Sequence, residues 1–424
     1  MATILIVTVF ILGYLLIALE HTVKVNKAAT ALMTGVLCWT IFIFENSSAH
    51  FVNEELLHHL GEIGSILFFL LGAMTIVELI DSHNGFSIIT RRINTTSKSR
   101  LLLVVSVITF FLSALLDNLT TTIVMTSLCA KLLSEREDRL WFAGMIVIAA
   151  NAGGAWSPLG DVTTTMLWIG GQITAYSIIT QIFLPSVAAA FIPALIIMYK
   201  FKGKQIVSMP KANDSEVDKR DGKIVLASGI GFLIFVPVFK TITHLPPFMG
   251  MLFALGCMWI ITTVLHKKKE SGFIQRYSVA HALQRIDTPS ILFFLGILLA
   301  VAALQSNGLL AEAATHLNAF LKNDYLIGTA LGLLSALVDN VPLVAAAQGM
   351  YDLTTYPTDH PFWEFLALTT GTGGSAIIIG SAAGVAAMGI EAINFMWYLK
   401  KISWLALIGF FAAIGVFLLE RMLW

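Results

Sequence analysis

Long apolar segments dominate the pattern of hydrophobic and polar positions along the chain. Ten of them approach or exceed the ~20 residues that a helix needs to cross a bilayer. They lie at residues 2–19, 28–45, 63–81, 140–169, 177–199, 223–240, 248–265, 289–305, 362–392 and 402–420. Such segments are typical of transmembrane helices, and 57% of all residues are hydrophobic. The pattern therefore predicts an all-α polytopic membrane protein, with the lipid bilayer as its surroundings, that crosses the membrane about ten times.

Two further apolar stretches, residues 101–133 and 325–350, are interrupted near their middle by Asp117-Asn118 and Asp339-Asn340. Basic residues flank the first stretch on both sides. A single crossing would put one basic cluster on the outer face, whereas a hairpin that enters and returns keeps both on the cytoplasmic face. The second stretch has acidic flanks. We therefore predict two re-entrant hairpins that enter from opposite faces, each with its Asp-Asn pair at mid-membrane.

The distribution of basic residues agrees with this topology. With the N-terminus outside, all but three of the 26 Lys and Arg residues fall on one face, the exceptions being Lys240, Lys322 and Arg421. Such an asymmetry marks the cytoplasmic side. A charged segment without hydrophobic periodicity, residues 201–222, then becomes a cytoplasmic linker. We expect a multi-pass protein of the bacterial inner membrane.

Short motifs recur in the two halves of the chain. Residues 65–70 (SILFFL) recur at 290–295, residues 113–118 (SALLDN) recur as SALVDN at 335–340, and Gly153-Gly154 with Gly160 recurs as Gly373-Gly374 with Gly380. Each half crosses the membrane five times, and an odd number turns the second copy upside down. We expect inverted repeats at residues 1–200 and 223–424, with broken helices at 140–169 and 362–392. Such repeats place a transport site at the midplane.

The segment 151–164 carries Gly153, Gly154, Pro158 and Gly160 inside an apolar stretch, so a continuous helix is not expected there. A broken helix exposes carbonyl oxygens beside Asp161 and the hydroxyls of residues 163 and 164. Such oxygen ligands suit Na⁺. The alternative is a packing kink whose polar groups bond one another.

Asp117, Asp161 and Asp339 are the carboxylates that this topology places near mid-membrane. Three unpaired carboxylates there would cost roughly 8 to 10 kcal/mol, and we expect no Lys or Arg beside them. They must then be protonated, cation-bound or hydrated, the states through which a cation/proton exchanger passes. Each Asp could instead cap a helix, which is less expected for all three. Asn118 and Asn340 fit a structural role as well as a liganding one.

The ends of the third apolar segment carry Glu62, Glu78, Asp81 and His83. Solvation at the membrane interface is the simpler interpretation of these residues. A role in sensing pH is the alternative, because an ordinary histidine titrates near neutral pH.

These residues resemble the NhaD-type sodium/proton antiporters of the ion transporter superfamily. The resemblance rests on residues 72–83, the two Ser-Ala-Leu-x-Asp-Asn tips and residues 151–164, and it extends over nearly the whole chain. It implies exchange of Na⁺ or Li⁺ for H⁺, a fold with two opposed hairpins, and a homodimer. By motif it implies transport roles for Asp117, Asn118, Asn151, Asp161, Thr163, Thr164, Ser335, Asp339 and Asn340.

Other functions fit the sequence less well. An anion carrier of the same superfamily, for dicarboxylate, arsenite or sulfate, would favour neutral tips where helix N-termini face the anion, and an Asp at each tip would repel it. An enzyme is not expected, because no nucleophile–base pair or metal motif is visible and Cys38, Cys129 and Cys257 are scattered. Balanced charge gives no indication of a nucleic-acid partner, and no cofactor is expected.

Overall fold

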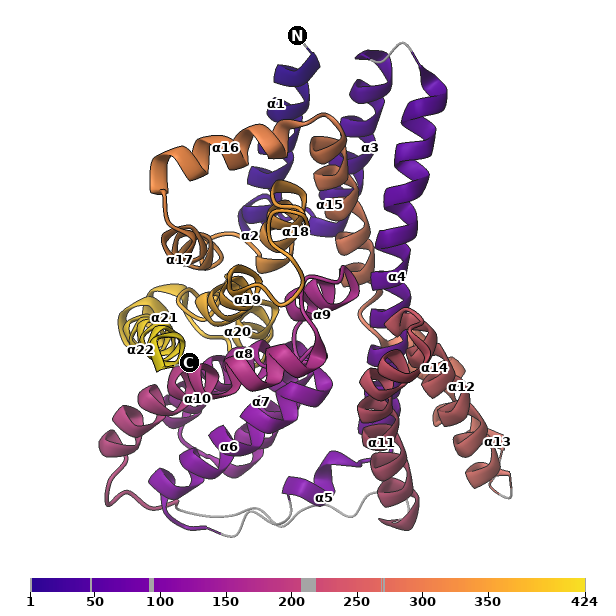
Figure 1. Cartoon of the computed structure of the whole chain (residues 1–424). Helices are drawn as coiled ribbons and strands as arrows, with labels where there is room; N and C mark the ends of the chain where they lie inside the picture. The colour runs from indigo at the N-terminus through magenta and orange to yellow at the C-terminus, as the bar shows by residue number, and fades with distance from the viewer. Residues whose placement is uncertain are drawn as a thin grey trace.

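The computed structural model describes residues 2–45, 48–90, 95–206, 219–267, 269 and 271–423, and these are almost entirely helical (Figure 1). Within these ranges the only β-type pairing is one isolated bridge between Ser97 and Gln205. The predicted all-α fold is confirmed. Most of the predicted linker, residues 207–218, lies outside the described residues.

The helices follow one another along the chain with short connections. They are α1 (Ala2–Ala18), α2 (Glu20–Val23), α3 (Lys27–Glu45), α4 (Ala49–Ser82), α5 (Phe86–Thr90), α6 (Lys98–Leu116), α7 (Asn118–Leu132), α8 (Arg136–Ala155), α9 (Val162–Ile169), α10 (Ala175–Lys200), α11 (Lys219–Thr243), α12 (Pro247–His266), α13 (Ser271–Arg276), α14 (Val279–Arg285), α15 (Thr288–Ser306), α16 (Leu309–Leu321), α17 (Asp324–Leu334), α18 (Asn340–Met350), α19 (Pro361–Gly373), α20 (Ala382–Glu391), α21 (Phe395–Lys401) and α22 (Ser403–Leu423).

Among the described residues, eight helices are long and apolar enough to cross a membrane: α3, α4, α6, α10, α11, α12, α15 and α22. The bent pair α20–α21 would make nine. This is a polytopic membrane protein. The number is below ten because α1 has only 17 residues, because segment 362–392 divides into two shorter helices, and because segment 140–169 divides into a short α9 and an α8 that has 20 residues but a charged first turn. Conversely, α6 reaches 19 residues although it was expected to be a short hairpin arm.

One group of helices packs around α4, whose 34 residues extend about 51 Å, well beyond a ~30 Å hydrocarbon core. Helices α12 and α15 contact α4, and α3 lies along α15. Small residues allow that close approach: a Cβ atom on Gly296 would lie 2.4 Å from the backbone of Ala31. Helix α16 lies at the upper left of Figure 1, below the upper ends of α1, α3 and α4, and was not expected from the sequence.

The two predicted hairpins are the pairs α6–α7 and α17–α18. In the first, the chain returns to its starting point, because Lys98 Nζ at the start of α6 lies 2.5 Å from Asp138 Oδ2, just beyond α7. In the second, the Tyr356 hydroxyl, just beyond α18, donates to Asp324 Oδ1 at the start of α17, 2.8 Å away. Both pairs have the geometry of a hairpin. Their insertion from opposite faces stays a prediction.

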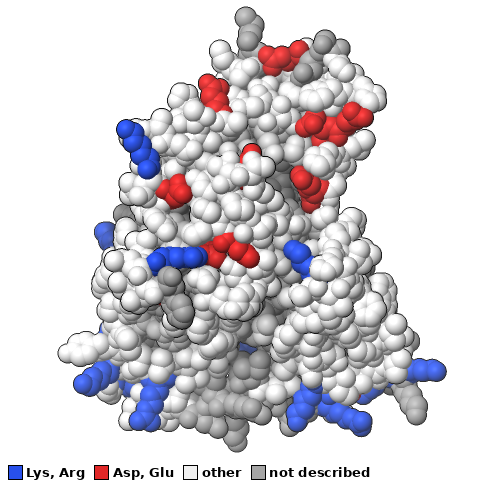
Figure 2. Space-filling view, in the orientation of Figure 1, with Lys and Arg blue, Asp and Glu red and all other residues white. Residues whose placement is uncertain are grey.

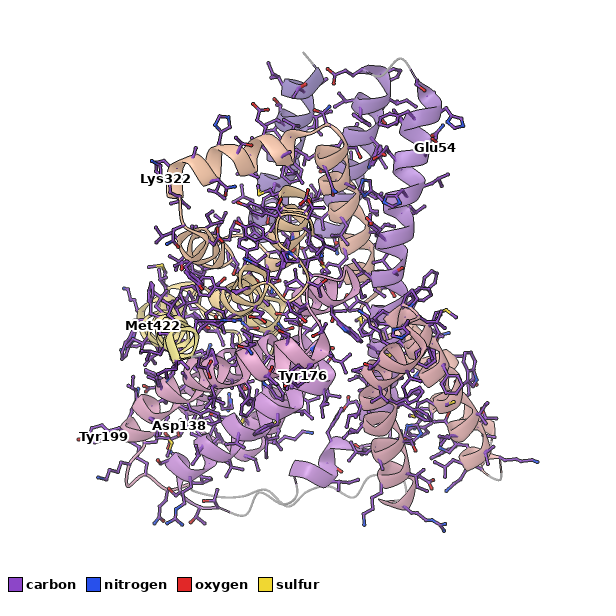
Figure 3. All side chains as sticks on the ribbon, in the orientation of Figure 1. Glu54, Asp138, Tyr176, Tyr199, Lys322 and Met422 are labelled. Carbon is purple, nitrogen blue, oxygen red and sulfur yellow. The ribbon has the colours of Figure 1, made fainter. Side chains whose placement is uncertain are left out.

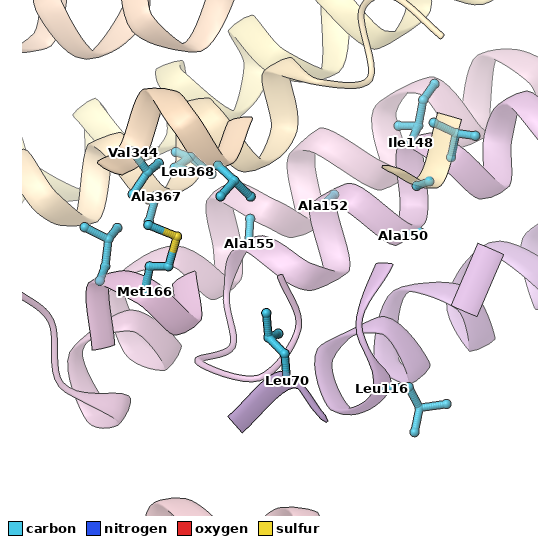
Figure 4. Packing of buried hydrophobic residues seen from close by; sticks show 14 of the residues in the cluster. Leu70, Leu116, Ile148, Ala150, Ala152, Ala155, Met166, Val344, Ala367 and Leu368 are labelled. Carbon is cyan, nitrogen blue, oxygen red and sulfur yellow. The ribbon is translucent and has the colours of Figure 1, made fainter. Parts of the chain in front are cut away.

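The two predicted helix breaks lie between α8 and α9 and between α19 and α20, and each is fastened to a hairpin. A Cβ atom on Gly153 would lie 2.2 Å from the carbonyl oxygen of Phe110 in α6, and one on Gly373 would lie 2.0 Å from that of Gly332 in α17. No side chain fits at either contact. Helix α8 packs against both α19 and α20. A Cβ atom on Gly371 in α19 would lie 3.0 Å from the Cβ atom of Ala155 in α8, which Figure 4 shows among the buried hydrophobic residues.

Candidate functional site

Four helix N-termini meet at a small cavity of about 70 Å³ in the middle of the protein. The first residues of α7, α9, α18 and α20 all line it: Asn118, Val162, Asn340 and Ala382. Two of these helices are second arms of hairpins, and two begin directly after a helix break. Each N-terminus carries about half a positive charge, so together they contribute roughly two positive charges to the cavity.

All three predicted aspartates line this cavity, and each caps one of the helices. Asp117 Oδ1 accepts from the N–H of Thr120 at 2.7 Å. Asp161 Oδ1 and Asp339 Oδ1 accept from the N–H groups two residues further on, both at 3.3 Å. The expectation that not all three would act as caps is wrong. A helix break that places an Asp in the membrane also leaves N–H groups there without partners, and the same Asp accepts from one of them.

Asp161 lies between the two hairpin tips. Its Oδ2 atom accepts one hydrogen bond from Asn118 Nδ2 and another from Asn340 Nδ2, both at 3.2 Å, and its side chain is buried. Asn118 Nδ2 also donates to Asn151 Oδ1 at 3.0 Å. Asn151 Nδ2 in turn donates to the hydroxyls of Ser375 and Ser381, both at 2.9 Å. One buried hydrogen-bond network therefore joins Asp161, both hairpins and both breaks.

A basic side chain also reaches the cavity, contrary to expectation. Lys27 lines it, and Lys27 Nζ lies 3.6 Å from Asp339 Oδ2. The sequence places Lys27 at the edge of an apolar segment, a position typical of a residue in a solvated loop. The structure shows that α3 begins at Lys27 and that this end packs beside the tip of the α17–α18 hairpin. Nothing in the local sequence indicates that contact.

The nine predicted residues divide into two sets. Five line the cavity: Asp117, Asn118, Asp161, Asp339 and Asn340. The other four lie behind it: Asn151, Thr163, Thr164 and Ser335. The Thr164 hydroxyl donates to the carbonyl of Asp161 at 2.9 Å and that of Ser335 to the carbonyl of Thr370 at 3.0 Å, which are structural bonds. The buried Thr163 hydroxyl has no hydrogen-bond partner among the described residues.

No three carboxylate, imidazole or thiol groups in the described part of the chain gather closely enough to hold a metal ion. An ion in the central cavity would therefore need amide, hydroxyl or water oxygens in addition to a carboxylate. The side-chain amides of Asn118 and Asn340 are bonded to Asp161 through their nitrogens, and each also carries a neutral oxygen.

Other buried carboxylates near the membrane-spanning helices have strong partners. Glu364 pairs with Arg421 and Ser177, Glu391 accepts from Arg139 Nε at 3.0 Å, and Asp138 pairs with Lys98. Figure 3 labels Asp138 near the bottom of the molecule, whereas Glu54 and Lys322 point away from its upper part.

Two larger cavities lie next to the central one. The lysine-lined cavity, about 750 Å³, includes Lys24, Lys27 and Asp287 and shares four lining residues with the central cavity: Lys27, Leu119, Ser290 and Ala382. The glutamine-lined cavity, about 360 Å³, includes Gln172, Gln305 and Gln348 together with His59 and Glu62, and shares none. The site thus borders the first cavity through shared residues and shares no lining residue with the second.

Comparisons with known proteins agree with the resemblance. A family model described as a citrate transporter matches residues 14–371. Sodium/proton antiporter 1 of Arabidopsis thaliana is 46% identical over 419 residues, covering 96% of this chain and 71% of that protein. Sodium/proton antiporter 2 of the same plant is 45% identical, covering 96% and 97%. The Na⁺/H⁺ antiporter NhaD of Vibrio cholerae is 29% identical, covering 97% and 90%. The chain therefore belongs to the family that this model describes and, within it, to the NhaD-type sodium/proton antiporters.

Proposed function

We propose that this protein exchanges Na⁺ or Li⁺ for H⁺ across the membrane at Asp161. The observation that carries the proposal is the position of its carboxylate, buried between two amides from different hairpins and beside two further aspartates in one small cavity. Its relatives that are named sodium/proton antiporters, 45–46% identical to it, support the same activity.

Exchange follows from competition between a proton and a cation for one carboxylate. Asn118 and Asn340 now present N–H groups to Asp161. An amide also carries an oxygen acceptor, so rotation of each side chain brings that oxygen toward a cation bound at the carboxylate. When the cation leaves, the N–H groups return and a proton replaces the positive charge. Asp117, Asp339 and the free hydroxyl of Thr163 complete the proposed ligand set, with Asn151, Thr164 and Ser335 supporting it.

The proposal includes the orientation of the protein in the membrane. Figure 2 shows Lys and Arg side chains along the lower edge of the molecule and most Asp and Glu side chains above them. A basic face is typical of the cytoplasmic side, so the linker 201–222 lies there. The lysine-lined cavity is then the cytoplasmic route, and the glutamine-lined cavity is the route from the other side. Alternating access requires the site to connect with one cavity at a time.

The anion carrier remains the second candidate, because four helix N-termini attract negative charge and because the matching family model is described as a citrate transporter. Two features oppose it. Three of the four N-termini are capped by an aspartate, which cancels their positive field. The central cavity of about 70 Å³ has room for a few water molecules but not for a tricarboxylate.

The test uses everted vesicles that hold an acid interior, with a fluorescent dye reporting the pH difference. Added Na⁺ or Li⁺ should collapse that difference in wild type. An Asp161→Asn variant should not respond, because an amide keeps the shape of the carboxyl group but releases no proton. Glu54→Gln, at an exposed position on α4, should behave as wild type. Wild-type vesicles that ignore both cations would overturn the proposal, and citrate uptake that requires Asp161 would favour the anion carrier.

A further inference from the structure

Lys27 has two partners that attract a positive charge. Its Nζ atom lies 3.6 Å from Asp339 Oδ2 and 4.4 Å from the centre of the Phe293 ring. The ring belongs to a fully buried residue of α15, and its face attracts a cation. The ammonium group can therefore leave Asp339 without losing every favourable contact.

Lys27 also lies where the site meets its open cavity. It lines both the central cavity and the lysine-lined cavity. Its side chain is 29% exposed and that of Asp339 is 21% exposed. A cation that enters the site from the lysine-lined cavity must pass this ammonium group and approach the carboxylate that it holds.

The charges of the site explain why such a group is there. Three carboxylates bring three negative charges, whereas four helix N-termini bring roughly two positive ones. With the Lys27 ammonium the total is close to zero, so the site is electrically balanced when neither a proton nor a transported cation is bound. A cation that binds while Lys27 stays in place adds an uncompensated charge. Binding is more favourable if Lys27 moves away.

We propose that the Lys27 ammonium is a tethered cation that competes with the transported ion for Asp339 and withdraws to Phe293 when that ion enters from the lysine-lined cavity. The inference rests on the proposed cation exchange. Lys27 acts as a positioning residue. None of the residues lining the glutamine-lined cavity is Lys or Arg, so the competition acts on one route only.

The test measures the Na⁺ concentration for half-maximal exchange and the maximal rate in the same vesicles. Lys27→Met removes the competitor, so the half-maximal concentration should fall by about two- to fivefold, the range in which partly exposed ion pairs contribute, while the maximal rate changes less. Lys27→Arg should restore the wild-type value. Lys24→Met is the matched control: it removes a lysine from the same cavity but not from the site, and should have a smaller effect.

A second variant should change the half-maximal Na⁺ concentration in the opposite direction while leaving the lysine in place. Phe293→Leu removes the alternative partner, so Lys27 should remain on Asp339 and the half-maximal Na⁺ concentration should rise. Unchanged concentrations in folded Lys27→Met, or a fall in Phe293→Leu, would overturn the inference. If either result is seen while Na⁺/H⁺ exchange persists, only the inference about Lys27 fails and the proposed function is unaffected. If wild type shows no exchange, Na⁺-dependent thermal stabilisation of purified Lys27→Met and wild type separates the two failures, since Lys27→Met should need less Na⁺ for the same shift.

Discussion

The lysine-lined and glutamine-lined cavities are built from corresponding positions of the two halves but differ in access and charge. Five pairs of positions at the repeat offsets line them: Ile123 and Ala345, Ser290 and Ser65, Ala386 and Met166, Gly389 and Ile169, and Ile390 and Gly170. One cavity shares lining residues with the site, and the other does not. Corresponding positions therefore line both cavities, which are the two proposed routes, and the packing between each cavity and the site is where they differ.

Only a thin layer of packing, here called the barrier, separates the glutamine-lined cavity from the central cavity. Met166 and Ala345 line the glutamine-lined cavity, while Thr165 and Val341, on the same two helices, line the central one. Gln348 Nε2 donates to the carbonyl of Met166 at 3.3 Å and holds α18 against α9. About one helical turn of packing therefore separates the cavity from the site.

The largest expected effect is on chemical access to a pair of serines at corresponding positions. We expect a membrane-impermeant thiol reagent added to the cytoplasmic face to modify Ser290→Cys and to block exchange, and to leave Ser65→Cys unmodified. The background should lack the three native thiols, of which Cys38 and Cys129 are buried and Cys257 is half-buried. Labelling of both variants from that face would contradict the difference between the cavities.

Exchanging the side chains at another pair tests the barrier itself. Met166 is buried in α9, close to α18 and α19 (Figure 4). Met166→Ala should lower stability by about 2 to 5 kcal/mol and allow Na⁺ to leak without proton exchange, measured by thermal melting and by ²²Na⁺ flux. Ala386→Met, at the corresponding position, should narrow the lysine-lined cavity and slow exchange. A Met166→Ala variant that is as stable as wild type and does not leak Na⁺ would show that the barrier lies elsewhere.

A smaller effect is expected from the hydrogen bond that holds the barrier. Gln348→Leu removes the bond to Met166 at a net cost of about 1 kcal/mol. The closed arrangement should then be less favoured, so Ser65→Cys combined with Gln348→Leu should be labelled from the non-cytoplasmic face faster than Ser65→Cys alone. Gln305→Leu, in the same cavity but with no hydrogen bond to α9 or α18 among the described residues, is the control. Equal labelling rates in all three would exclude a role for this bond.

The smallest expected effect concerns the end of α4 away from the glutamine-lined cavity. His83 follows α4 directly, its Nε2 atom lies 3.3 Å from that of His266, and burial lowers its pKa to about 4. The unfolded chain, with a pKa near ~6.5, takes up a proton first as the pH falls, so stability is lost between about pH 6.5 and pH 4. His83→Gln should remove about 1 kcal/mol of this loss near pH ~5.5. A melting temperature with the same pH dependence in both proteins would contradict it.

Features that depend on glycines and helix-capping residues could be predicted from the sequence. The two Asp-Asn tips and the two breaks lie where the recurring Asp-Asn and Gly-Gly motifs placed them, because glycine and helix caps act locally. Lys27, the triple capping and the shared carboxylate oxygen of Asp161 depend on which elements meet in three dimensions, and no local signal marks them. The inverted arrangement, the homodimer and the bacterial inner membrane stay predictions.

The fastening of each hairpin to its neighbouring broken helix has a mechanical consequence. Because Gly153 and Gly373 bring backbone against backbone, the three aspartates belong to one closely packed block, and we expect its elements to move together. Lys27 and Lys240 reach that block from the helices around α4: one pairs with Asp339, and the other donates to the carbonyl of Trp168 at 2.7 Å. Under the proposed alternating access, movement of these elements against the helices around α4 would have to break both lysine contacts.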